Sequence, residues 1–106
     1  MNTDKDFRAW VRRQPSCVSG CFSEWQDGEG RCEFAHVRRV ARGSGVGIKP
    51  PFSGVPLTHK EHAMQHRRGE AYVLAANGIV TDDAAAWFAR MANQYLEAWL
   101  CEIADR

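Results

Sequence analysis

All four histidines of the chain fall between positions 36 and 66, and three of them have a spacing that suits metal binding. His59, His62 and His66 follow the pattern i, i+3, i+7, which places them on one face of a helix. An i, i+4 pair of imidazoles such as His62 and His66 can bind one divalent ion. We therefore predict a metal site formed by His62 and His66 with His59 beside them. The alternative is a set of surface histidines on a polar helix.

The remaining histidine, His36, falls in a predicted strand from Cys32 to Val40. In a strand its side chain points to the face opposite Glu33 and Ala35, so it need not bind the metal directly. We predict that His36 is a general base, because a neutral imidazole can take a proton from a water that attacks a phosphodiester. The alternative is a half-buried histidine bonded to a backbone carbonyl.

A strand, a loop, a second strand and a helix must position these side chains. The order Thr58-His59-Lys60-Glu61 is typical of a capping box, which predicts a helix from His59 to about Arg68. Residues 41–51 contain three glycines and two prolines and are predicted to form an irregular loop. Residues 52–57 can supply the second strand.

The N-terminal segment from Asp4 to Gln14 is predicted to be a short helix. Phe7, Trp10 and Val11 fall at i, i+3, i+4, the Asp at the start can cap the helix, and Pro15 ends it. This apolar stripe must pack against another element.

Three further segments complete the predicted order. Residues 16–30 are polar and contain glycine, which favours a loop or knuckle, and residues 70–76 favour a short helix ending at Asn77-Gly78. Thr81 is expected to cap a long helix that runs to about Ala104 and serves as a scaffold. Cys101 lies in this helix and is predicted to be part of the core. The apolar stripe of the helix comprises Phe88, Met91, Tyr95 and Trp99. We thus predict an α+β fold in a single domain, residues 1–106.

Composition is that of a folded globular protein. The chain has 106 residues and a formal net charge of +1, a length suited to one domain. It shows no apolar run long enough to span a bilayer and no signal-peptide pattern at its start, so we expect a cytoplasmic protein. Reducing conditions there favour thiols or metal ligands over disulfides. The cysteines are Cys17, Cys21, Cys32 and Cys101.

Charge is unevenly distributed along the chain. From Arg31 to Arg68 there are eight Lys or Arg against Glu33 and Glu61, whereas from Gly69 onward the acidic residues are in excess. A polyanion could bind the basic middle segment, and a solvated charged face is the alternative.

Three sequence segments together resemble the HNH (ββα-metal) endonuclease superfamily. They are CEFAHVR at 32–38, GSGVGIKP at 43–50 and VPLTHKEHAMQH at 55–66. The chain looks most like the phage-borne branch that contains the Ref-like recombination nucleases, over roughly Cys17 to Glu70. The resemblance implies a β-hairpin and helix at about 31–69 that hold one catalytic metal. It also implies cleavage of DNA, a phage or prophage origin in a bacterial host, and a recombinase as a partner to consider.

By motif position the resemblance makes His36 the general base and His62 and His66 the metal ligands. Arg38 matches the arginine that follows the first histidine and would bind phosphate, and Lys49 matches the loop lysine. Phosphate contacts of low sequence specificity are expected from the basic residues of this region. These are Arg38, Arg39, Arg42, Lys49, Arg67 and Arg68.

The resemblance also concerns cofactors. The catalytic ion would be Mg²⁺, Mn²⁺, Ni²⁺ or Zn²⁺, and imidazole ligands suit the borderline metals. Relatives often carry a structural zinc on cysteine pairs, which here would use Cys17, Cys21 and Cys32, with no clear fourth ligand. Ala35 departs from the family pattern, because relatives often have a metal-binding Asp or His at that position. This departure favours an alternative function, a catalytically inactive nucleic-acid or protein-binding module.

Overall fold

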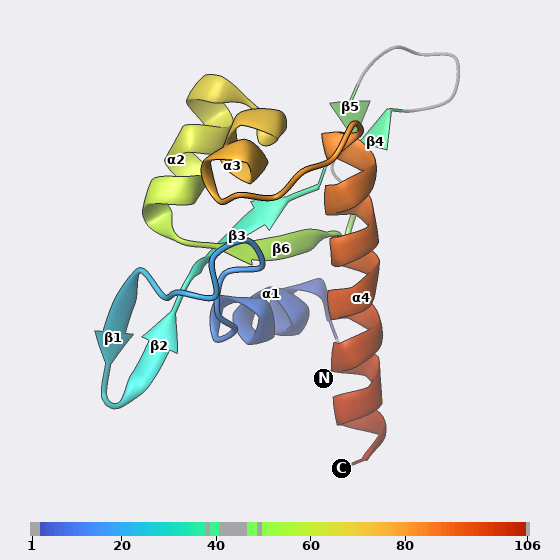
Figure 1. Ribbon diagram of the computed structural model, residues 1–106. Coiled ribbons are helices and arrows are strands. Elements are labelled where there is room, and N and C mark those ends of the chain that lie inside the picture. The colour runs from blue at the N-terminus through green and yellow to red at the C-terminus, as the bar shows by residue number, and fades with distance from the viewer. Residues whose placement is uncertain (1–2, 38, 41–46, 49, 106) are drawn as a thin grey trace.

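A small antiparallel sheet lies at the centre of the computed structural model, with helices on both of its faces (Figure 1). The structure describes residues 3–37, 39–40, 47–48 and 50–105, and for residues 39, 40, 47 and 48 it describes the backbone only. The elements in chain order are α1 (Asp4–Arg12), β1 (Glu24–Gln26), β2 (Glu29–Arg31), β3 (Glu33–His36), β4 (Arg39–Val40), β5 (Gly47–Ile48), β6 (Gly54–Leu57), α2 (His59–Arg68), α3 (Glu70–Ala76) and α4 (Ala84–Ala104). This order confirms the predicted α+β class.

The central sheet consists of β3 and β6, which pair in an antiparallel register from Glu33 opposite Leu57 to His36 opposite Gly54. Helix α2 follows β6 after a single residue, Thr58. β3, β6 and α2 therefore supply the predicted strand, second strand and helix, with β4 and β5 between the two strands in the chain. The first strand is shorter than the predicted range of 32–40.

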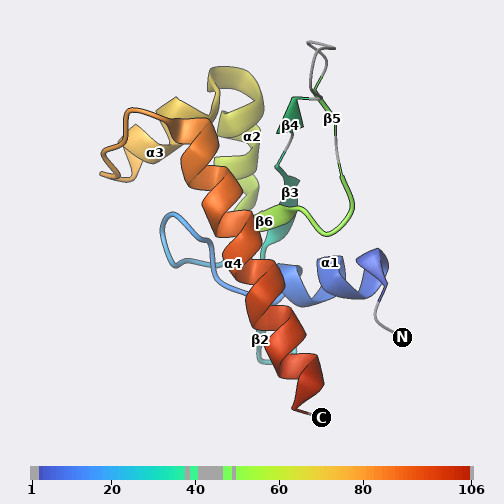
Figure 2. The ribbon, with the colours of Figure 1, turned by 90° about the vertical axis from the view of Figure 1, so that its right-hand side faces the viewer.

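Both faces of this sheet are covered. Ala35 and Val55, which are opposite each other in the register, pack with residues of α3 and α4. On the other face Phe34 packs with Phe7 of α1 and Trp99 of α4. Figure 2 shows α4 running past the sheet from the side of α2 and α3 to the side of α1. The long helix therefore belongs to both apolar clusters, which is why its apolar stripe is broad.

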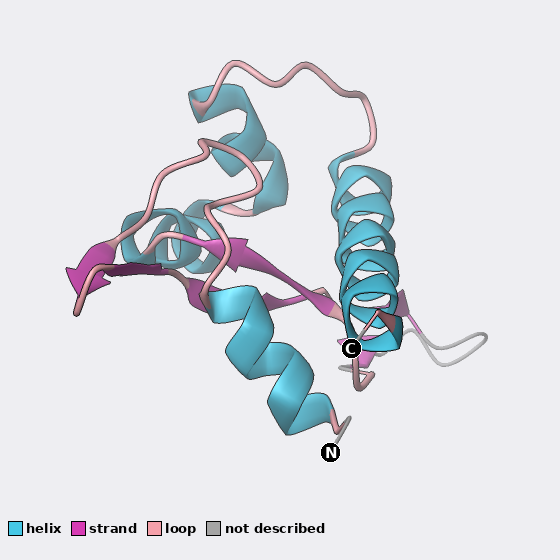
Figure 3. Cartoon of the chain, turned by 90° about the horizontal axis from the view of Figure 1, so that it is seen from below, coloured by secondary structure: helices cyan, strands magenta, loops and turns pink. Residues whose placement is uncertain are grey.

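Helix α1 is capped by Thr3 and not by Asp4, which corrects the prediction. The Thr3 side chain accepts a hydrogen bond from the Asp6 backbone, and the Asp6 carboxylate accepts one from the Thr3 backbone, forming a capping box. Asp4 is instead free to reach another element: its Oδ1 accepts a hydrogen bond from the backbone N–H of Phe52 at 2.8 Å. Figure 3 shows α1 from below the sheet.

The structure contains two hairpins that were not predicted, each with at least one strand in a segment that we predicted to be irregular. Within residues 16–30, β1 and β2 pair around Asp27 and Gly28, whose φ angles are 51° and 81°. Two successive positive φ angles are typical of a type I′ turn, for which Asp-Gly is a favoured sequence. The Asp27-Gly28 dipeptide could therefore have been used to predict this hairpin from the sequence. β5 lies in the predicted loop at 41–51 and pairs with β4, which lies at the end of the predicted strand at 32–40.

The helices after the sheet largely follow the prediction. Helix α2 has the predicted bounds and the predicted capping box between Thr58 and Glu61. Gly69, with φ of 91°, separates it from α3. Two details were wrong: Asp83 rather than Thr81 caps α4, and Cys101 is exposed rather than part of the core. Among the described helices, none combines the length and the apolar character that a bilayer crossing needs.

Candidate metal centre

The carboxylate of Glu33, at the start of β3, joins two histidines of α2. Its Oε2 lies 2.5 Å from Nδ1 of His59, and its Oε1 lies 2.8 Å from Nδ1 of His62. Burial raises the pKa of Glu33, but the hydrogen bonds from His59 and His62 outweigh that effect and hold the pKa below its usual value. Because an ionised carboxylate only accepts hydrogen bonds, the Nδ1 atoms of both histidines carry the protons.

His62 and His66 turn their other ring nitrogens toward each other. The two Nε2 atoms are 3.2 Å apart. When His62 is neutral and donates from Nδ1 to Glu33, its Nε2 accepts a hydrogen bond from Nε2–H of His66. A metal ion bound to both atoms would take the place of that proton. Two imidazole nitrogens bound tetrahedrally to one zinc ion lie about 3.3 Å apart. The spacing of this pair therefore fits two ligands of a single ion.

The pair has no third protein ligand among the residues that the structure describes. Among the residues that the structure describes, no three His, Cys, Asp or Glu side chains form a group that could hold a metal ion. Ala35 shares the face of Glu33 and offers no donor atom. An ion on His62 and His66 would therefore complete its coordination with water or substrate.

His59 does not converge with the other two histidines in the same way. Its side chain is 78% exposed and bonds through Nδ1 to Glu33. In the described part of the chain, no hydrogen bond joins His59 to His66. The structure thus brings His62 and His66 together and places His59 on the other oxygen of Glu33.

His36 lies on the opposite face of β3, as strand alternation predicted. Its ring meets the edge of Phe34 at a centroid distance of 5.1 Å, and its Nε2 lies 2.6 Å from Nη2 of Arg8 in α1. A guanidinium can only donate a hydrogen bond, so Nε2 of His36 is the acceptor. Since a neutral imidazole has a single lone pair, Arg8 occupies the atom that a general base would use.

Sequence reasoning missed Arg8 and its own partner. Nε of Arg8 donates to Oδ2 of Asp4 at 3.1 Å, and Asp4 also holds the backbone of Phe52 at 2.8 Å. The guanidinium further lies 5.1 Å from the centre of the Phe34 ring. Arg8 and His36 are 28 positions apart in the sequence, and no local pattern links them.

Two of the three cysteines predicted to hold zinc, Cys32 and Cys21, donate their thiols to separate backbone carbonyls. Sγ of Cys32 donates to the carbonyl of Cys21 at 3.4 Å, and Sγ of Cys21 donates to the carbonyl of Ser19 at 3.7 Å. Burial, together with the nearby Glu61 carboxylate, raises the pKa of Cys17 to about 12. Burial also raises the pKa of Cys32. The structural zinc stays a prediction.

We expect thiol alkylation to separate the cysteines into two classes. Cys21 and Cys101 are exposed and should react with iodoacetamide in the native state. Cys17, whose pKa rises from 9.0 to about 12, should present about a thousandfold less thiolate and stay unmodified until the chain is unfolded. Mass spectrometry of the labelled peptides measures this. Protection of Cys17, Cys21 and Cys32 together on addition of Zn²⁺ would instead support the structural zinc.

Four of the six residues predicted to contact DNA have side chains outside the described part of the chain. Arg38, Arg42 and Lys49 lie outside the described residues, and only the backbone of Arg39 is described. Arg67 is exposed in the last turn of α2. Of the residues predicted to contact phosphate, Arg67 and Arg68 are therefore the ones whose side chains the structure describes, and both are exposed.

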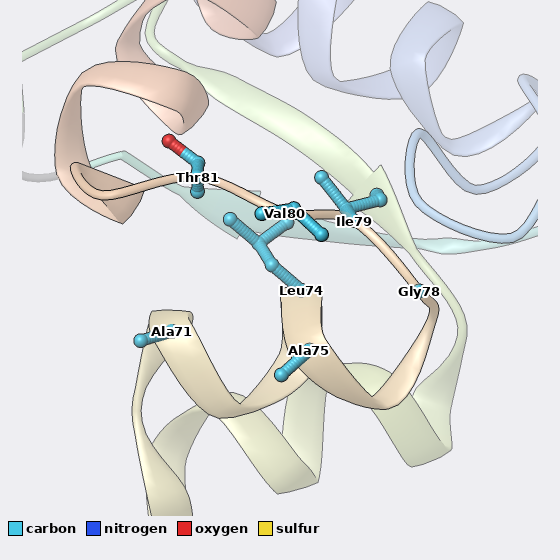
Figure 4. A pocket seen from close by; sticks show the side chains of 7 residues that line it. All are labelled: Ala71, Leu74, Ala75, Gly78, Ile79, Val80 and Thr81. Atoms are coloured by element: carbon cyan, nitrogen blue, oxygen red, sulfur yellow. The ribbon is translucent and has the colours of Figure 1, made fainter.

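An apolar hollow lies away from the histidines, between α3 and the segment that leads to α4 (Figure 4). Its volume is about 290 Å³. It is lined by Ala71, Leu74, Ala75, Gly78, Ile79, Val80 and Thr81. None of these side chains ionises near neutral pH, so this hollow offers no acid, base or metal ligand.

The geometry defines a centre of two converging histidines and one supporting carboxylate at the junction of a strand and a helix. Comparison of the chain with protein-family models, with curated proteins and with solved structures gave no match.

Proposed function

We propose that the chain is a metal-dependent endonuclease that hydrolyses DNA phosphodiester bonds, with β3, β6 and α2 as a ββα-metal core of the HNH type. The observation that carries the proposal is the 3.2 Å separation of the Nε2 atoms of His62 and His66, with Nδ1 of His62 bonded to Glu33. The resemblance of the segments around these residues to HNH nucleases supplies the reaction class.

Within this proposal, Glu33 sets the tautomer and orientation of His62. A metal-binding histidine usually donates its second ring N–H to a carboxylate or carbonyl, which fixes the ring and raises its basicity. His62 and His66 would hold the ion. A bound divalent ion would stabilise negative charge on the scissile phosphate and the leaving oxygen. A site with few protein ligands leaves positions for water and substrate, which is typical of catalytic rather than structural centres.

His36 is the proposed general base. The oxygen of a water forms a bond to phosphorus, the bond from phosphorus to the leaving oxygen breaks, and the proton of the water passes to Nε2 of His36. This step requires Arg8 to leave Nε2, and it requires the phosphate bound to the ion to reach the face of β3 opposite Glu33. A phosphate oxygen is a strong acceptor for a guanidinium, so an incoming phosphate would draw Arg8 away and expose the base.

A second candidate function is a non-catalytic module that binds metal and nucleic acid. The placement of His36 on the face of β3 opposite Glu33 favours it, as does the absence of a donor atom on Ala35. In this candidate the contact between Arg8 and His36 is structural and persists in the complex with DNA.

Nicking of supercoiled plasmid tests the two candidates. Wild type and His36→Ala are treated with chelator, and Mg²⁺, Mn²⁺, Ni²⁺ or Zn²⁺ is then added separately. We expect metal-dependent nicking by the wild type and a loss of about a hundredfold or more in the variant, since general-base catalysis contributes roughly 10²–10⁴ in rate. Circular dichroism confirms that the variant is folded.

The outcomes separate the assignments. Nicking that is unchanged in His36→Ala would remove His36 as the base while keeping the nuclease. No nicking with any metal, with one ion bound per chain, would favour the binding module.

A further inference from the structure

A second polar surface lies where the end of α2 meets α3. A hollow of about 440 Å³ is lined by Met64, Arg67, Arg68 and Tyr72. Met64 follows His62 by two residues, and Arg68 follows His66 by two residues. Two residues on an α-helix correspond to a rotation of about 200°. Met64 and Arg68 therefore lie on the side of α2 away from His62 and His66.

The side chains of this hollow combine an aromatic ring with two cations. The guanidinium carbon of Arg68 lies 4.6 Å from the centre of the Tyr72 ring, and Tyr72 is 43% exposed. Arg67 and Arg68 are also exposed. Within the described part of the chain, no salt bridge pairs either arginine with a carboxylate. Two positive charges are therefore available to an anionic ligand beside an accessible aromatic surface.

Such a surface suits a ligand that is flat and apolar at one end and anionic at the other. A nucleobase stacks on aromatic rings and on guanidinium planes, and the attached phosphate accepts hydrogen bonds from arginine. The bases of a duplex are already stacked inside the helix, so only an unpaired strand can offer a base to this hollow. An acidic peptide would satisfy the two charges but would leave the aromatic surface without a stacking partner.

We propose that Met64, Arg67, Arg68 and Tyr72 form a binding site for one nucleotide of an unpaired nucleic-acid strand. The base stacks on the paired side chains of Arg68 and Tyr72 and contacts Met64, and Arg67 binds the adjacent phosphate. This site needs neither the metal nor cleavage. It is therefore separate from the proposed nuclease centre.

Fluorescence anisotropy of a labelled oligothymidylate of eight nucleotides, with the full chain in EDTA, tests this site. Tyr72→Ala should weaken binding by about five- to 150-fold, the equivalent of the roughly 1–3 kcal/mol that stacking contributes per base. Tyr72→Phe keeps the ring and should bind within about twofold of the wild type on the same grounds. Arg90→Ala removes an exposed cation from α4 and is the matched control for charge, with no comparable loss expected.

Three results would overturn the site. One is equal affinity of Tyr72→Ala and the wild type for the oligothymidylate. Another is binding of a polyglutamate competitor as strong as that of the oligothymidylate, which would indicate an acidic partner. The third is an equal effect of Tyr72→Ala on a duplex of the same length. Because the assay contains EDTA, failure of plasmid nicking leaves its outcome unaffected.

Discussion

Replacing His66 with Ala is expected to lower the affinity of the chain for Ni²⁺ by at least about a hundredfold, because half of the two-histidine chelate is lost. The Nε2 atoms of His62 and His66 are 3.2 Å apart, and in the proposed centre both would bind the same ion. His66 is exposed on α2, and its truncation should leave the fold intact. Titration calorimetry with Ni²⁺ measures the affinity, and metal-dependent nicking should disappear in the same variant.

Two variants of neighbouring residues give the comparison. His59→Ala removes a histidine of the same helix that hydrogen-bonds to Oε2 of Glu33. We expect the affinity of this variant for Ni²⁺ to change by less than about threefold, the size of an ordinary surface substitution. For Glu33→Gln we expect the affinity for Ni²⁺ to fall by about 10–100-fold, which is the usual effect of removing a residue that orients a metal ligand. This loss lies between those of the two histidine variants. Equal losses in His59→Ala and His66→Ala would contradict the two-histidine centre and favour a site that includes all three.

Replacing Leu57 with Ala is expected to cost about 2–5 kcal/mol of the free energy of unfolding, which is the usual range for a fully buried leucine. Leu57 has no exposed surface and belongs to the cluster between the sheet and the helices α3 and α4. A small domain has only about 5–15 kcal/mol of total stability. Urea denaturation followed by circular dichroism measures the loss.

Leu100→Ala is the matched control, because the substitution is the same and the leucine is 47% exposed on α4. We expect it to cost less than about 1 kcal/mol, as usual for surface positions. Similar losses in the two variants would mean that the face of the sheet carrying Ala35, Val55 and Leu57 is not packed as described.

Short-range sequence patterns predicted helix α2, which carries His62 and His66. Thr58 and Glu61 cap α2 as their spacing predicted, and Gly69 ends it. Capping depends on backbone groups within three or four residues, so such features can be inferred from a short window of sequence. The Asp27-Gly28 turn was equally local, and the hairpin it forms could have been predicted from the same kind of signal.

The contacts that define the candidate site join residues that are far apart in the sequence. Glu33 and His62 are 29 positions apart, and Arg8 and His36 are 28 apart. Alternation along a strand predicted that Glu33 and His36 would face opposite ways, but it could not say which helix covers each face. That depends on how the apolar stripes of α1 and α4 share the two faces of one small sheet.

By itself, therefore, the sequence determined the spacing of the histidines, the bounds of the helix that carries them and the side of the strand on which His36 lies. Only the tertiary structure decided that Glu33 supports His62 and that Arg8 occupies Nε2 of His36. The physical reason is that periodicity and capping are properties of neighbouring residues, whereas these two contacts arise from packing between elements that are distant along the chain.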